Sequence, residues 1–116
     1  MTHPSEDLVK TIISGIEEVK GENITILDLR KIENSVCDFF VITDVQSSTQ
    51  VKAISDSIEK SVREDLNDRP WHVEGKENAE WILMDYVQVA VHIFRKEARK
   101  FYDIESLWSD APAQSA

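Results

Sequence analysis

A run of fourteen residues, 81–94 (WILMDYVQVAVHIF), is the longest apolar, β-branched and aromatic stretch in the chain, and it contains neither Gly nor Pro. This composition favours buried β-structure over a helix. Because fourteen residues exceed one typical strand, the polar break at 85–88 predicts two antiparallel strands, about 80–85 and 88–94, joined by a tight turn. We expect the rest of the chain to pair with this hairpin or to cover it.

Helix and strand patterns alternate before the hairpin. Residues 4–20 have apolar side chains at helical spacing, with Pro4 at the start and Gly21 at the end, and predict a helix. Residues 23–29 and 37–43 predict strands, and the second is apolar on both faces, which indicates a central place in the sheet. A helix over 47–66 is expected to open with a capping box of Ser47 and Gln50.

The remaining segments complete an α/β pattern. Residues 71–74 predict a short strand, and the strand–helix–strand order around 51–66 predicts a right-handed crossover between parallel neighbours. Residues 95–108 are expected to be mostly helical, and 109–116 to be a flexible tail. The fold class is therefore α/β, a mixed sheet of about five strands flanked by helices, in a single domain 1–108. The side chains expected to face inward from the last helical segment are Ala98, Phe101, Tyr102, Ile104 and Leu107.

Size and charge limit the classes of function. A chain of 116 residues is expected to form one domain, and its single cysteine cannot form an internal disulfide. The lack of a signal peptide pattern or an apolar run of about 18 residues predicts a cytoplasmic protein without a membrane span. The net charge of −9 argues against general binding to nucleic acid. It suits docking on a basic partner, although solubility alone also explains it.

Groups that could carry out catalysis are scattered. His3, His72 and His92 lie far apart in the sequence, whereas a metal site needs convergent ligands. We expect His92, inside a strand, to be a structural or surface group. Cys37 is expected to be an inert thiol, because no helix N-terminus lies behind it to lower its pKa. Three glycines form no phosphate-binding loop. We therefore expect no catalytic residue, metal or cofactor.

Two further groups of residues leave alternatives open. Asp28, Asp38 and Asp44 lie at strand ends, where they could hold Mg²⁺ if two of them converged. Loop capping is the interpretation that we prefer for them. Most of the aromatic side chains are expected in the core, but Tyr86 at the hairpin tip is the best candidate for an exposed anchor, since Tyr is enriched at protein interfaces.

Seven short segments, in this order and spacing, resemble the ribosomal silencing factor family, also called Iojap-like. The resemblance extends from about residue 8 to residue 108. The family usually has Asp-Tyr-Gly-Asp at the hairpin turn, where this chain has the sequence DYVQ at 85–88. The matching segments are 28–30 (DLR), 37–42 (CDFFVI), 50–54 (QVKAI), 74–75 (EG), 81–86 (WILMDY), 91–94 (VHIF) and 99–108 (RKFYDIESLW).

The resemblance implies a nucleotidyltransferase-like sheet without catalytic activity, often as a homodimer. It implies a cytoplasmic factor that binds the large ribosomal subunit through the ribosomal protein numbered fourteen. There it would block joining of the small subunit and repress translation. The residues inferred for this interface are Lys76, Trp81, Leu83, Asp85, Tyr86, His92 and Phe94.

Two other hypotheses remain. One is a nucleotidyltransferase-like, metal-dependent enzyme that uses Asp28, Asp38 or Asp44 with Mg²⁺. This class needs a Gly-Ser loop and paired acidic residues on one strand, and the chain has neither. The other is a dimeric scaffold for a different partner.

Overall fold

A six-stranded mixed β-sheet lies at the centre of the computed structural model, which describes residues 4–116. Within residues 4–116 only β2 and β5 run parallel, and every other neighbouring pair of strands is antiparallel. The strands, in their order across the sheet, are β3 (His72–Glu74), β4 (Trp81–Asp85), β5 (Val89–Arg95), β2 (Phe39–Val45), β1 (Glu22–Asp28) and β6 (Ala113–Ser115).

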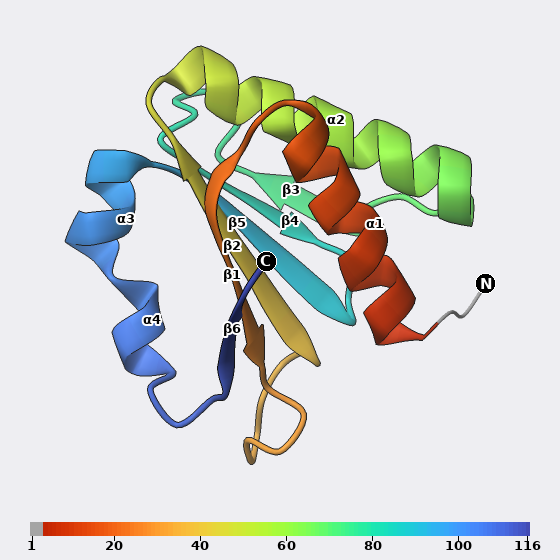
Figure 1. The fold of residues 1–116 in the computed structure, drawn as a ribbon, viewed down its shortest axis with the longest axis vertical. Helices are drawn as coiled ribbons and strands as arrows, with labels where there is room; N and C mark the ends of the chain where they lie inside the picture. Colours follow the sequence, from red (N-terminus) through yellow and green to blue (C-terminus); the bar gives the residue numbers. More distant parts are fainter. Residues whose placement is uncertain (1–3) are drawn as a thin grey trace.

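Two long helices, α1 (Ser5–Glu18) and α2 (Ser48–Leu66), lie together on one face of this sheet (Figure 1). They approach closely at Gly15, where an added Cβ would lie 3.0 Å from the Cα of Ile58. The apolar stripes of both helices bury alternate residues of the central strands, among them Val41, Val91 and Ile93. This face of the sheet is therefore sealed from solvent.

Two short helices, α3 (Lys96–Tyr102) and α4 (Ile104–Leu107), lie on the opposite face with the segment that leads to β6 (Figure 1). Ile104, Trp108 and Ala111 pack there against strand residues such as Phe40 and Phe94 and form a second, smaller core. The covering elements are short, so part of this face remains open over β3, β4 and β5.

The predicted class, the hairpin and the capping box of the second helix are confirmed, whereas the first helix spans Ser5–Glu18 with Pro4 as its N-cap and Val19 as its C-cap. The sheet is mixed, β4 and β5 are antiparallel, and β2 lies between β5 and β1. Ser47 and Gln50 form the expected capping box at the start of α2. The sheet has six strands rather than about five. The parallel neighbour of β2 is β5, not the strand that directly follows α2, because β3 lies at the outer edge beside β4.

The predictions for the C-terminal segment were partly wrong. Asp103, at φ 44°, separates α3 from α4, so the side chains do not follow one helical stripe. Phe101, Tyr102 and Leu107 are 81%, 48% and 79% exposed instead of facing inward, whereas Ile104 is buried as expected. The expected tail 109–116 contains β6, which pairs with β1 because that edge of the sheet would otherwise leave its backbone groups without partners.

No helix among residues 4–116 combines the length and the apolar character that crossing a membrane would take.

Candidate docking surface

The uncovered part of the sheet contains a hollow of about 390 Å³. Successive strand residues point to opposite faces. Since their neighbours in β4 and β5 pack under α1 and α2, the residues Leu83, Asp85, Ala90 and His92 point to the other face. The strand register sets Leu83 opposite His92 and Asp85 opposite Ala90, so these four side chains form the floor with Phe40 of β2.

The rim of the hollow is apolar and exposed. Val36, Trp71 and Val87 are 81%, 76% and 59% exposed, although large apolar side chains favour burial. They come from three different loops, before β2, before β3 and between β4 and β5. Contiguous exposed apolar groups mark surfaces where proteins bind one another. The nine residues that line the hollow are Val36, Cys37, Phe40, Trp71, Leu83, Asp85, Val87, Ala90 and His92.

His92 is the most unusual group in the hollow. It is 6% exposed, and its Nδ1 accepts a hydrogen bond of 3.1 Å from the indole Nε1–H of Trp81. Its ring and the ring of Phe40 meet edge to face, with 4.7 Å between the ring centroids. Burial lowers the pKa of His92 to about 4, so the imidazole is neutral at pH 7.

Two other polar groups complete the hollow. Asp85 accepts a hydrogen bond of 2.7 Å from the backbone N–H of Val87, which stabilises the hairpin turn. Burial raises the pKa of the Cys37 thiol to about 11. Because the thiolate is the reactive form, this shift supports the interpretation of Cys37 as an inert thiol. The hollow therefore offers apolar contact, one carboxylate and one neutral imidazole.

Three of the seven predicted interface residues line the hollow: Leu83, Asp85 and His92. Trp81 lies beside it, half-buried, with its ring stacked on Phe94 at 4.9 Å and in contact with Tyr102. Trp81 therefore holds the imidazole of His92 in place through the hydrogen bond to Nδ1.

The other three predicted interface residues lie elsewhere. Phe94 is fully buried, so its ring cannot be a surface contact. Lys76 forms an ion pair with Glu59 of α2 at 3.9 Å, away from the hollow.

The prediction that Tyr86 is an exposed anchor was wrong. Its side chain is 5% exposed and packs in the core under α1 and α2. The residue follows β4 directly, and the alternation along the strand turns it to the helix-covered side, which a position at a hairpin tip does not reveal. Within residues 4–116 its hydroxyl has no hydrogen-bond partner, and burial raises the pKa of the phenol.

The aspartates of the enzyme hypothesis serve separate structural contacts. Asp28 accepts hydrogen bonds from the side chain of Arg30, which lower the pKa of the carboxyl group. Asp38 accepts a hydrogen bond from the hydroxyl of Ser5 at the start of α1. Both carboxylates lie at the same end of the sheet, but each already holds a partner from the chain.

Asp44 lies near the other end of β2. Its nearly buried carboxylate is 2.9 Å from the Nζ of Lys96 and 3.1 Å from a guanidinium nitrogen of Arg99. Two cations occupy the space that a metal ion would need. Across residues 4–116 there is no group of three or more His, Cys, Asp or Glu side chains arranged to hold a metal.

Sequence reasoning missed six of the lining residues. Phe40 and Ala90 could have been found, because they alternate with residues of the sealed face on predicted strands. Trp71 and Val87 lie in loops, and only the fold brings these loops to the same rim. The full set of missed residues is Val36, Cys37, Phe40, Trp71, Val87 and Ala90.

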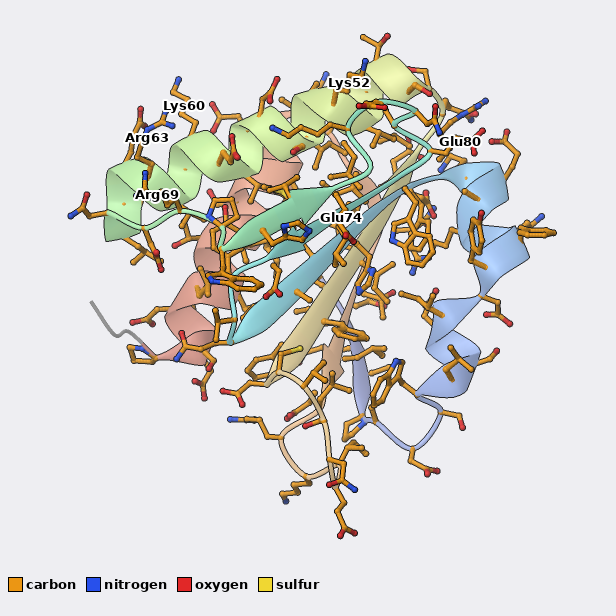
Figure 2. All side chains as sticks on the ribbon, turned by 180° about the vertical axis from the view of Figure 1, so that it is seen from behind. Lys52, Lys60, Arg63, Arg69, Glu74 and Glu80 are labelled. Carbon is orange, nitrogen blue, oxygen red and sulfur yellow. The ribbon has the colours of Figure 1, made fainter. Side chains whose placement is uncertain are left out.

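Side chains of both charges lie around these surfaces. Figure 2 shows Lys52, Lys60 and Arg63 along α2, Glu74 on β3, and Arg69 on the loop that leads to Trp71. Asp85 adds a carboxylate within the hollow itself.

The fold and the hollow define a class of small α/β domain, sealed by long helices on one sheet face and open on the other. The family model described as "Ribosomal silencing factor during starvation" matches residues 2–116. The chain belongs to this family, the ribosomal silencing factors.

Comparisons with individual relatives support the same family. "Ribosomal silencing factor RsfS" of Halalkalibacterium halodurans is 33% identical over 108 residues, which cover 93% of this chain and 91% of the relative. The protein of the same name from Bacillus subtilis is 34% identical, with coverage of 92% and 89%. A crystal structure of a protein from Chromobacterium violaceum superposes with a TM-score of 0.86 at 33% identity, and covers 92% of this chain and 88% of that one.

Proposed function

We propose that this protein represses translation in the cytoplasm by docking through the hollow on the large ribosomal subunit, at the ribosomal protein numbered fourteen. The observation that carries the proposal is the apolar hollow with Trp71 exposed at its rim. Exposed Trp side chains are common anchors of protein interfaces. Membership of the silencing factor family supports the ribosome as the partner.

Charge supports a basic partner. The chain has a net charge of −9, and Asp85 is the charged residue among those that line the hollow. Opposite potentials steer two proteins together and set their orientation. A ribosomal protein whose basic side chains surround an apolar contact would match both features, with Asp85 receiving one of its cations.

The mechanism is steric. A body with extents of 33 × 33 × 23 Å, held on the face of the large subunit that meets the small one, would exclude the small subunit from that place. This mechanism requires no bond to be made or broken, which agrees with aspartates that are already engaged in structural contacts. Repression then depends on the fraction of large subunits that carry the bound protein.

We also propose that the protein forms a homodimer in solution. Leu107 on α4 is 79% exposed and lies outside the hollow, which supports a second apolar contact surface. Light scattering coupled to size-exclusion chromatography measures the mass directly. A mass of one chain at all concentrations would reject the dimer and leave the docking proposal intact.

Binding to purified large subunits tests the docking surface. Trp71→Ala should weaken co-sedimentation by about tenfold or more, because an exposed anchor is lost while the core is untouched. Phe101→Ala is the matched control, since Phe101 is equally exposed but lies outside the hollow. If both variants bind like the wild type, the hollow is not the docking surface.

A subunit-joining experiment tests the steric step. Separated subunits are mixed with the protein in excess and resolved on a sucrose gradient. We expect free subunits to accumulate with the wild type and intact ribosomes to form with Trp71→Ala. Normal joining in the presence of bound wild-type protein would reject the blocking mechanism.

A further inference from the structure

The hollow contains one polar atom that the chain itself leaves unused. Within residues 4–116, Nε2 of His92 has no hydrogen-bond partner and less than 1 Å² of exposed surface. The whole residue is 6% exposed and lines the hollow. A buried polar group without a hydrogen-bond partner destabilises the folded protein, so its presence at a candidate docking site calls for a reason.

Trp81 determines which nitrogen of His92 carries the proton. An indole N–H can only donate, so Nδ1 of His92, 3.1 Å from Nε1 of Trp81, must be the unprotonated acceptor. A neutral imidazole has a single N–H, which is then on Nε2. The unused atom is therefore a donor, held in place by the stack of Trp81 on Phe94.

We propose, on the basis of the docking function above, that the Nε2–H of His92 donates a hydrogen bond to a backbone carbonyl oxygen of the docked protein segment. A segment that enters an apolar hollow loses water from its carbonyl groups and needs a donor for each of them. A neutral acceptor fits better than a carboxylate, because Asp85 lies in the same hollow and would repel an anion. Trp81 is the positioning residue that keeps this donor ready.

Docking must also uncover the atom. Leu83 lies opposite His92 in the strand register, is only partly buried and lines the same hollow. A docked carbonyl oxygen reaches the atom only after the side chains around it shift. The donor would then be shielded from water in the free protein and satisfied in the complex.

The tautomer is tested first, in the unmodified free protein. Long-range ¹H–¹⁵N correlation spectra of the imidazole distinguish a proton on Nε2 from a proton on Nδ1. We expect the Nε2–H form for His92 at neutral pH, and the exposed His72, whose Nε2 lies 3.1 Å from a carboxylate oxygen of Glu74, gives a separate signal in the same spectrum. The Nδ1–H form would overturn the proposal.

The donor is tested next by the affinity for purified large subunits. His92→Asn places an amide oxygen near the position of Nδ1, where it can still accept from Trp81, but has no donor at the position of Nε2. We expect affinity about tenfold lower than the wild type, the loss of one buried hydrogen bond. Unchanged affinity would overturn the proposal, whereas failure of the wild type to bind would reject the docking function itself.

Trp81→Phe is a second variant, and it tests the proposed hydrogen bond of His92 if His92→Asn does not fold. It keeps an aromatic ring over Phe94 but removes the indole donor. The spectra should then show a mixture of both tautomers, and affinity should fall several-fold. A mixture of tautomers with wild-type affinity would overturn the proposal, because a purely structural histidine would behave in this way.

Discussion

A guanidinium nitrogen of Arg99 lies 3.1 Å from the carboxylate of Asp44, and this contact joins helix α3 to strand β2. Their side chains are only 13% and 8% exposed. The same guanidinium group donates to the carbonyl oxygen of Asn23 on β1 and to Glu105 on α4. One buried cation therefore connects four elements on the side of the sheet that carries the second core.

Arg99→Ala should lower the free energy of unfolding by about 3 kcal/mol, because it leaves a nearly buried carboxylate with one partner fewer. Urea denaturation measures the change. Arg30→Ala is the control: Arg30 also pairs with two carboxylates, but in an exposed place, so its loss should change little. Equal losses for both variants would contradict the importance that we give to burial.

Val87→Gly should stabilise the protein by about 1 kcal/mol. Val87 has φ 73°, and a hydrogen bond of 2.9 Å from Gln88 N–H to the carbonyl of Tyr86 closes a three-residue turn around it. A β-branched residue is strained in this region, whereas glycine is not. Thermal melting compares the variants, and Val87→Ala should show less of the gain because it keeps a Cβ. A glycine variant less stable than the wild type would contradict this account.

Gly15→Ala should destabilise the protein by about 1–2 kcal/mol despite the higher helix propensity of alanine. The added Cβ would meet backbone atoms of Ser57 and Ile58, which cannot move aside as a side chain end can. Ser14→Ala, one residue earlier and exposed, should be neutral or slightly stabilising. Denaturation midpoints of the two variants provide the comparison, and equal midpoints would contradict close contact between α1 and α2.

Burial of His92 should make stability depend on pH. In the unfolded chain its pKa is near 6.5, whereas in the folded protein it is about 4. Between these values the unfolded state holds more protons, so this stabilisation is complete above pH 6.5 and is lost as the pH falls toward 4. The loss should reach about 3 kcal/mol.

Urea denaturation of the wild type and of His92→Asn between pH 7.5 and pH 4 measures this effect. The difference between the two proteins removes the contribution of the carboxylates. We expect the stability of the wild type to fall more steeply than that of the variant. Parallel curves would contradict a depressed pKa for His92.

Removal of residues 112–116 should remove the backbone hydrogen bonds that protect the side of β1 facing β6. The backbone N–H of Asp28 donates to the carbonyl of Pro112 at 3.0 Å, so its hydrogen exchange should become faster in the truncated chain. The N–H of Leu29 donates instead to Asp38 and provides the internal control. Unchanged exchange at Asp28 would show that β6 does not pair stably with β1.

The sequence predicted the elements that local patterns determine. The run at 81–94 has the composition of buried strands with a polar break, and the structure has β4 and β5 in these places. Ser47 and Gln50 interact within a single helical turn, so their capping box needs no distant information. Leu83 and His92 were both inferred for the interface, and the structure places them side by side in the hollow.

The sequence predictions were wrong where tertiary contacts determine the structure. Phe101 and Leu107 were assigned to a core because one continuous helix was assumed, whereas Asp103 in the left-handed region divides that helix. β6 has little intrinsic strand preference and forms because β1 offers it an edge. Trp71 and Val87 meet at one rim only after six strands have been ordered, which no pattern within a short segment can reveal.

The two border strands of the sheet, β3 and β6, are each three residues long. A neighbouring molecule therefore finds too little free backbone to extend the sheet from one copy to the next. This brevity would let a cell raise the concentration of the protein steeply without the onset of fibril growth.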